Sequence, residues 1–408
     1  MPDCLGLVFY LLIRIIMDKG YSYNKVFAAA CLGMLLFGCA LISVGSFMPA
    51  IIQKFHFDSL QAGTLASVLP AGILFGSLVF GPFVDRYSYK YLLIICSIVF
   101  ILGMEGIAFA QSLFILQVSF FLIGFGGGTL NGATNAMVAD ISDASSKNSS
   151  ANLSLLGVFF GIGALGIPIL LSVLTSTYSF EQIIKIAGVV VVFPLVYFIL
   201  VKYPSVKEPQ AVSLKQALKM LRDKKLLVLA IFLFFQSAIE GIVNNWTTTY
   251  LLKSGEIDTE LTLKALSVFV VSLTVARIFL AAVLRRISAY KVLLFSIILL
   301  LAGVLVFSIQ STFSVYLTGL VLIGFGVAAG FPVVLAYVSH LYSNQRGTAF
   351  SIAIVIGLLG NIGVNYLTGI VAHHIGINRF PIILLICSML LLIITITQIK
   401  QFHKKVRI

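Results

Sequence analysis

Apolar stretches long enough to cross a bilayer dominate this chain after residue 26. A helix needs about 20 consecutive apolar residues to span the hydrocarbon core. Twelve such stretches follow one another, most of them separated by short polar links. They fall near residues 27–51, 60–83, 91–110, 114–138, 151–175, 183–201, 226–251, 262–284, 291–309, 313–339, 349–371 and 380–399. The pattern predicts an all-α membrane protein with twelve transmembrane helices.

One link is long and divides the chain in two. Residues 202–225 hold two prolines, then leucines at helical spacing among lysines, which predicts an amphipathic helix lying on the inner leaflet. Residues 5–17 are apolar but too short to span, and Arg14 interrupts them. They predict an interfacial helix, unless translation begins at Met17. The predicted parts are an N-terminal segment (1–25), a first bundle (26–201), the linker (202–225), a second bundle (226–400) and a basic tail (401–408).

The two halves repeat one another. The string LIGFG occurs at residues 122–126 and again at 322–326, and residues 81–88 align with 281–288 at the same offset. Two parallel six-span halves of this kind place a ligand site near the bilayer midplane, between them. We therefore expect two pseudo-symmetric six-helix bundles around a central cavity.

Basic residues orient the predicted helices. With the N-terminus inside the cell, 21 of the 27 Lys and Arg residues fall in inner segments and four in outer loops. This is the asymmetry of the positive-inside rule, so both termini are expected in the cytoplasm and the protein in the cell (inner) membrane. The net charge of +13 then reflects topology, and no nucleic-acid partner is expected. We expect a monomer embedded in the lipid bilayer.

The seventh stretch is the most polar of the twelve. Glu240 and Asn244 lie four residues apart on one helical face, and Trp246 is the only tryptophan of the chain. One interpretation is a packing contact with a tryptophan at the membrane interface. The other is a ligand site between helices, because polar residues within spans usually face a bundle interior or water. The polar residues of this stretch are Gln236, Glu240, Asn244, Asn245 and Trp246.

Two asparagine pairs extend this interpretation. Asn131 and Asn135 lie on the fourth stretch, and Asn361 and Asn365 on the eleventh, each pair on one face. An amide offers both a donor and an acceptor, as a hydroxyl-bearing ligand requires, and an aromatic ring can pack against the apolar face of a sugar. The alternative for each asparagine is a hydrogen bond between helices.

Charged residues within the stretches are candidates for ion coupling. Glu240 is the first choice and Glu105, on the third stretch, the second. Arg277, on the eighth stretch, could pair with Glu240 across adjacent helices and offset the cost of burying both.

No catalytic set emerges from the sequence. The five histidines are not spaced with acids or cysteines as metal ligands, and the five cysteines lie in or near apolar segments without paired spacing. There is no phosphate-binding loop. We therefore expect neither an enzyme nor a metal or other cofactor.

The segment GPFVDRYSYK, residues 81–90, resembles the signature G-x-L-x-D-R-x-G-x-R/K of the major facilitator superfamily of transporters, departing at Phe83 and Ser88. The resemblance covers essentially the whole chain after residue 26. It implies the major facilitator fold and a gate at the inner surface.

In that gate Gly81 allows close helix approach and Asp85 accepts hydrogen bonds from a neighbouring helix end, while Arg86 and Lys90 hold the loop at the membrane surface. Simple positive-inside anchoring would explain Arg86 and Lys90 as well, but not Asp85.

A narrower resemblance concerns the ligand. Residues 124–140, 159–168 and 324–332 are similar to the fucose, galactose and glucose permease group of this superfamily. That group commonly has a carboxylate on the fourth span where this chain has Asn131. An amide can bind a sugar hydroxyl but cannot carry a proton, which puts proton symport through this position in doubt.

The sequence thus predicts secondary active or facilitative transport of a small neutral solute, a sugar above others, by alternating access, with protons or another ion as possible coupling partners. The alternative is a proton-coupled drug or metabolite exporter of the same superfamily. The predicted ligand residues are Asn131, Asn135, Gln236, Glu240, Asn244, Trp246, Asn361 and Asn365.

Overall fold

A computed structural model describes residues 21–400 except 58, 175–176, 205–218, 255–256, 258 and 310–311. The predicted N-terminal interfacial helix, most of the amphipathic linker and the basic tail lie outside the described residues. The described residues contain twelve helical segments long and apolar enough to cross a membrane, which confirms the predicted fold class.

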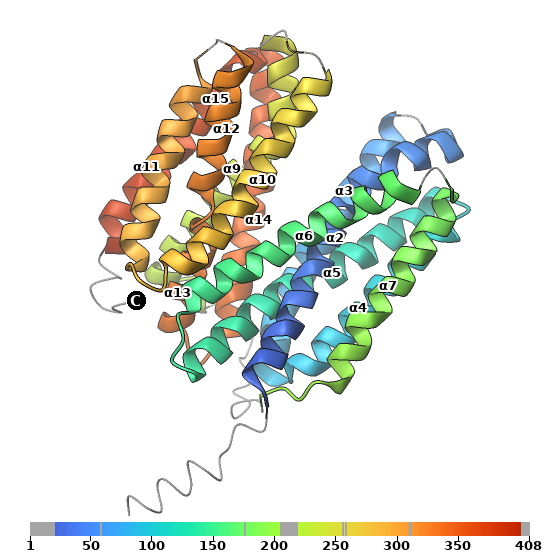
Figure 1. Cartoon of the computed structure of the whole chain (residues 1–408), viewed down its shortest axis with the longest axis horizontal. Coiled ribbons are helices and arrows are strands. Elements are labelled where there is room, and N and C mark those ends of the chain that lie inside the picture. Colours follow the sequence, from blue (N-terminus) through green and yellow to red (C-terminus); the bar gives the residue numbers. More distant parts are fainter. Residues whose placement is uncertain are drawn as a thin grey trace, which may run out of the picture.

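The first six spans are continuous helices that form one bundle (Figure 1). Their central sequences are apolar nearly all round, as expected of helices that contact either one another or lipid. Within this bundle α5 packs against α3 and α4, and α2 packs against α6. The helices are α2 (Tyr23–Phe55), α3 (Ser59–Arg86), α4 (Tyr89–Ala108), α5 (Leu113–Ala144), α6 (Ser149–Leu174) and α7 (Phe180–Leu200).

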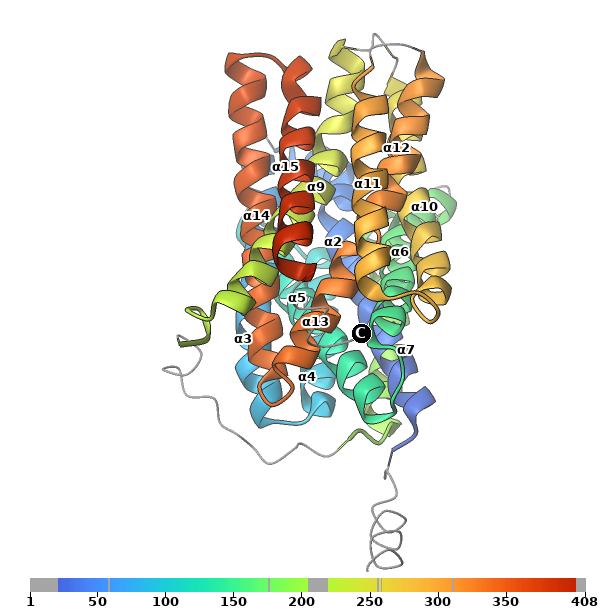
Figure 2. The same cartoon turned by 90° about the vertical axis from the view of Figure 1, so that its left-hand side faces the viewer.

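The second six spans form the other bundle, in which α9 packs against α14 and α12 against α10 and α11 (Figures 1 and 2). The helices are α9 (Lys224–Ser254), α10 (Thr259–Val283), α11 (Ala289–Phe307), α12 (Phe313–Val327), α13 (Gly330–Leu341), α14 (Arg346–His374) and α15 (Phe380–Ile394), the last preceded by η1 (Ile377–Arg379) and followed by η2 (Thr395–Ile399).

Equivalent positions of the repeated sequence make equivalent contacts. Gly124 of α5 lies against the backbone of α3 at Leu69, and Gly324 of α12 lies against the backbone of α10 at Phe269. A side chain at either glycine would overlap the neighbouring helix. The repeated LIGFG string therefore serves close helix packing in both halves.

The tenth span is interrupted, a feature that the sequence pattern did not predict. Helix α12 ends at Val327 and α13 begins at Gly330. Pro332 has no N–H to donate to the carbonyl of Ala328, so the helical ladder fails at this point. Val327 is the last residue of α12, and its carbonyl accepts a hydrogen bond from the side-chain amide of Gln236, on α9, at 2.7 Å. Such breaks occur at membrane depth only where protein or water satisfies the backbone.

The two bundles contact each other mainly through α3 with α14 and α6 with α10, with α13 against α6 and α5. In Figure 1 the bundles lie closest at the lower end, around α13, and lean apart toward the upper end. The lower end holds the α3–α4 and α13–α14 connections, which the charge pattern predicts to be cytoplasmic. We call it the inner end.

Candidate functional site

A group of polar side chains lies near the middle of α9. Gln236 is buried, and its amide donates to Glu240 Oε1 at 3.0 Å as well as to Val327. Gln236 thus fixes the Glu240 carboxylate in position and ties it to the break in the tenth span. The side chain of Glu240 keeps 19% of its surface exposed. A carboxylate exposed at this depth requires a water-filled space, because lipid cannot solvate it.

Arg277, on α10, is the ionic neighbour of Glu240. Its Nη2 lies 3.9 Å from Glu240 Oε2, which confirms the pairing that the sequence suggested. Its Nη1 donates to the carbonyl of Gly157, on α6 of the other half, at 3.3 Å. One guanidinium therefore contacts both halves.

A chain of hydrogen bonds joins α9 to α14. Asn365 Oδ1 accepts from the indole Nε1 of Trp246 at 3.1 Å and from the amide of Asn245 at 3.0 Å. The Asn365 amide in turn donates to the Asn361 carbonyl and to Asn361 Oδ1, both at 2.9 Å. These bonds hold the orientation of the tryptophan ring and place it beside the asparagine pair.

The Asn361 side chain lies directly over Gly241 of α9, and any side chain at that glycine would overlap its amide. Gly241 follows Glu240 in the chain, so Asn361 lies next to the carboxylate-bearing turn of α9. Trp246, Asn361 and Asn365 therefore form one polar group between α9 and α14, adjacent in the chain to Glu240; its role in binding a ligand stays a prediction.

Three predicted residues contribute less than the sequence suggested. The Asn244 amide donates to the Glu240 backbone carbonyl at 2.8 Å, so its exposed side chain offers a ligand mainly its oxygen. On α5, the Asn135 amide donates to the carbonyl and to Oδ1 of Asn131. These recorded bonds of the α5 pair stay within α5 and do not reach α9 or α14.

Glu105 lies apart from this neighbourhood. Its carboxylate is beside Gly188, and α4, which carries it, packs against α7 on the far side of the first bundle. The structure does not bring Glu105 together with Glu240.

An ionic cluster at the inner end was not predicted. Arg346, the first residue of α14, pairs with Asp140 and with Asp143, the latter at 2.5 Å. Both acids lie on the last turns of α5, in the other half. Tyr89 donates to Asp140, and Ser339 donates to Asp143 at 3.1 Å. We call Tyr89, Asp140, Asp143, Ser339, His340 and Arg346 the inner cluster.

The sequence held a partial signal for this cluster. Two acids three residues apart share a helical face, which predicts a basic partner. Nothing in the pattern identified Arg346 as that partner, since it lies more than 200 positions away and had been assigned only to an inner loop.

The signature segment meets the second half beside this cluster. Gly81 lies against Gly347 and Ser351 of α14, and the Ser351 hydroxyl donates to the carbonyl of Ser77. The Lys90 backbone N–H donates to Ser88 Oγ, which caps α4. The side chains of Asp85 and Arg86 lie outside the described residues, so their gating role stays a prediction.

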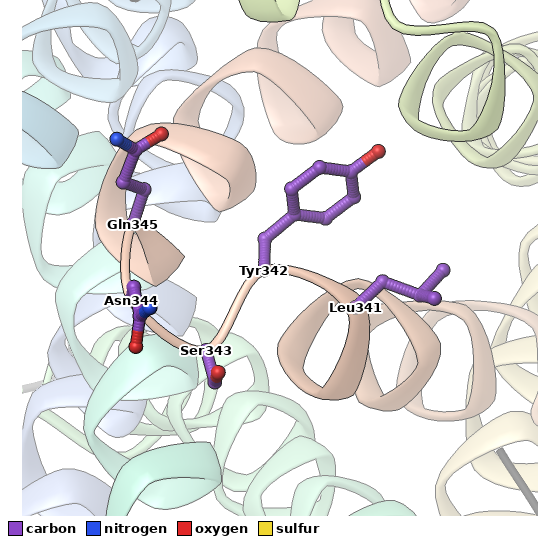
Figure 3. A pocket seen from close by; sticks show the side chains of 5 residues that line it. All are labelled: Leu341, Tyr342, Ser343, Asn344 and Gln345. Atoms are coloured by element: carbon purple, nitrogen blue, oxygen red, sulfur yellow. The ribbon is translucent and has the colours of Figure 1, made fainter.

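A surface hollow of about 270 Å³ lies elsewhere, in the α13–α14 connection, lined by residues 341–345 (Figure 3). Burial, with the nearby Asp223 carboxylate, raises the pKa of Tyr342 there and keeps its phenol neutral. The hollow contains none of the predicted ligand residues.

Comparison with known families settles what kind of protein this architecture belongs to. The model of the Major Facilitator Superfamily matches residues 27–262 and 256–401. The chain belongs to the Major Facilitator Superfamily. It is therefore a multi-pass membrane transporter and not an enzyme.

Individual relatives are distant but cover most of the chain. The glucose/mannose transporter GlcP of Bacillus subtilis is 25% identical over 354 residues, 83% of this chain and 87% of its own. The E. coli fucose:proton symporter FucP superposes with a TM-score of 0.77 at 20% identity, covering 92% of this chain and 98% of FucP. The human organic anion transporter MFSD10 gives 0.75 at 17%, covering 92% and 99%. At these low identities, the similarities to FucP and MFSD10 show only that the fold is shared.

Proposed function

We propose that this protein transports a neutral sugar across the membrane by alternating access, binding it between the two halves. The observation that carries the proposal is the polar group of Trp246, Asn361 and Asn365 between α9 and α14, adjacent in the chain to the partly exposed Glu240. It offers one oriented aromatic ring, amide groups and a carboxylate acceptor, which together match a ring with several hydroxyls.

The similarity to GlcP, whose name gives glucose and mannose as its substrates, supports a sugar ligand. The fold does not determine which ligand is transported, since a fucose symporter and an organic anion transporter share it. The site itself favours a neutral ligand, because its one arginine already faces Glu240.

Contacts between the halves support alternating access. The inner cluster joins α5 to α13 and α14, and Ser351 joins α14 to α3. These bonds close the inner end, so a ligand would reach Glu240 from the opposite side. Transport would require the inner cluster to separate while the outer ends approach.

Uptake into vesicles containing the purified protein tests the proposal. Labelled glucose, mannose, xylose and fucose would be offered with and without an imposed pH gradient. We expect saturable uptake of at least one of them, and faster uptake with an acidic exterior if Glu240 carries protons. Absence of uptake for every sugar, together with pH-driven efflux of lipophilic compounds, would favour the exporter alternative.

A further inference from the structure

Glu105, which the polar group between α9 and α14 leaves unused, lies on the lipid-facing side of α4. The exposed large apolar residues of this helix and its C-cap follow one another at helical spacing: Tyr91, Ile95, Ile98, Leu102 and Phe109. Glu105 continues this stripe between Leu102 and Phe109, and it is itself partly exposed. A carboxylate therefore lies within a surface that otherwise contacts lipid tails.

Lys185 lies on the corresponding side of α7. It precedes Val189 by four residues, and Val189, Val192 and Val196 are exposed at helical spacing. Helix α7 packs against α4 on the side of the first bundle that faces away from the second bundle (Figure 1). Two neighbouring helices thus each carry one charge, of opposite sign, on their lipid-facing surfaces.

The two charged groups lie at the same helix contact but are not paired. A side chain at Gly188 of α7 would overlap Glu105 Oε1, so the carboxylate lies against α7 one turn from Lys185. Lys185 Nζ lies instead over the Phe109 ring, 4.3 Å from its centroid. Among the described residues, no ion pair or side-chain hydrogen bond includes Glu105 or Lys185. The described part of the protein therefore supplies neither charge with a counter-ion.

Both groups lie near the end of the bundle opposite the inner end. Glu105 is one turn from the end of α4, and Lys185 is within two turns of the start of α7, so both lie roughly 5–8 Å from the helix ends. This is the depth at which headgroups meet hydrocarbon, where a charge needs a counter-ion or water. Two other charged residues at this end, Lys54 and Glu181, already pair with each other at 2.8 Å.

The second half shows that the fold does not need these charges. At the offset of 200 residues that relates the halves, Glu105 corresponds to Leu305 and Lys185 to Leu385. Leu305 is 55% exposed, so in α11 an apolar side chain occupies the same lipid-facing position. Since leucine is sufficient for the structure in one half, the charged pair of the other half points to a partner that carries both charges.

We propose that the α4–α7 surface binds an ethanolamine phospholipid, whose headgroup carries a phosphate and a primary ammonium. The phosphate oxygens accept hydrogen bonds from Lys185, and the ammonium donates to Glu105, both as charge-assisted bonds. A choline headgroup has the same charges but no N–H to donate, and a glycerol headgroup has no cation for Glu105. The surface lies away from the α9–α14 group, so this inference does not rest on the proposed sugar transport.

Lipid binding to the purified, delipidated protein in detergent tests the assignment. Native mass spectrometry would count bound lipid during titration with phospholipids of identical acyl chains that carry ethanolamine, its mono- and dimethylated forms, choline or glycerol. We expect the ethanolamine lipid to bind about threefold or more tightly than the choline lipid, with affinity falling at each methylation because N–H donors are lost. This series is measured on the unaltered protein and needs no variant.

Variants then assign the two contacts. Glu105→Gln should lower the affinity for the ethanolamine lipid to that for the choline lipid, because a neutral amide attracts the ammonium far less than a carboxylate. Lys185→Gln should weaken the binding of both lipids by a similar factor, about threefold or more, because both present the same phosphate. Glu181→Gln removes an acid that is already paired with Lys54 at the same end, and it should keep the preference of the parent.

Equal binding of the ethanolamine and choline lipids by the parent, or a preference that persists in Glu105→Gln, would overturn the proposal. Tightest binding of the glycerol lipid would overturn it as well, because the surface would then recognise a negative headgroup through Lys185 alone. Sugar uptake does not enter these measurements, so a failure of the proposed sugar transport would leave the lipid site intact, and the reverse also holds.

Discussion

Asn365 shows how a single side chain organises the site. Its oxygen accepts from Trp246 and Asn245, and its amide donates to Asn361, so it connects the aromatic ring to the Asn361 side chain. The Asn361 end of this chain is positioned by the absence of a side chain at Gly241. The site therefore depends on a small residue as much as on its polar ones.

At the residue scale, Gly241→Ala should push Asn361 away from α9. We expect sugar affinity to fall roughly tenfold, as when a buried polar partner is lost, together with a lower melting temperature. Gly363→Ala on α14 is the matched control, because nothing lies within contact distance of that position. Calorimetric titration and thermal unfolding in detergent measure both effects; equal behaviour of the two variants would contradict this geometry.

The tenth span illustrates what pattern can and cannot predict at the scale of an element. Hydropathy predicted this span correctly as one apolar stretch, because whether a segment enters the membrane depends on its composition. It missed the break between Val327 and Gly330, because the Val327 carbonyl at the end of α12 is bonded by Gln236, on a helix far away in sequence. The repeated LIGFG string, in contrast, predicted two similar halves, and its glycines make equivalent close contacts in both, since small residues allow close helix approach.

We expect Gln236→Leu to destabilise the protein, because the buried Val327 carbonyl would lose the donor that Gln236 supplies. The cost should be about 1–3 kcal/mol, against about 0.5 kcal/mol or less for Gln117→Leu on α5. Thermal unfolding of the purified variants measures the difference. A Gln236 variant as stable as the parent would show that the break is satisfied in another way.

At the scale of the whole molecule, two layers of contact cross between the halves. Arg277 with Gly157 forms the deeper layer, and the inner cluster around Arg346 forms the layer at the membrane surface. The sequence predicted the halves, their likeness and much of the α9–α14 neighbourhood, because these follow from hydropathy, repeats and local polar patterns. It did not predict the inner cluster, whose acids and arginine meet only through the packing of α5 against α14.

Arg346→Ala should loosen the inner end, because Asp140 and Asp143 would lose their shared cation. We expect the distance between spin labels at the exposed inner-end positions Lys202 and Ile287 to lengthen. The double variant Asp140→Asn, Asp143→Asn should lengthen the same distance. Combining all three changes should add little, since they break one cluster. Arg379→Ala, an exposed arginine at the other end, serves as control. Identical distances in the parent and in Arg346→Ala would contradict a gating role.

The central claim is that a neutral sugar binds beside Trp246, and the single tryptophan of the chain permits a direct measurement. The purified protein would be titrated with glucose, mannose, xylose and fucose while the emission of Trp246 is followed, with calorimetry in parallel. We predict a saturable emission change that matches the heat of binding for at least one sugar, with weaker binding in Trp246→Phe and much weaker binding in Trp246→Ala. If Trp246→Ala binds the sugar as tightly as the parent by calorimetry, or if no sugar changes the emission of the folded protein, the site is not where we place it.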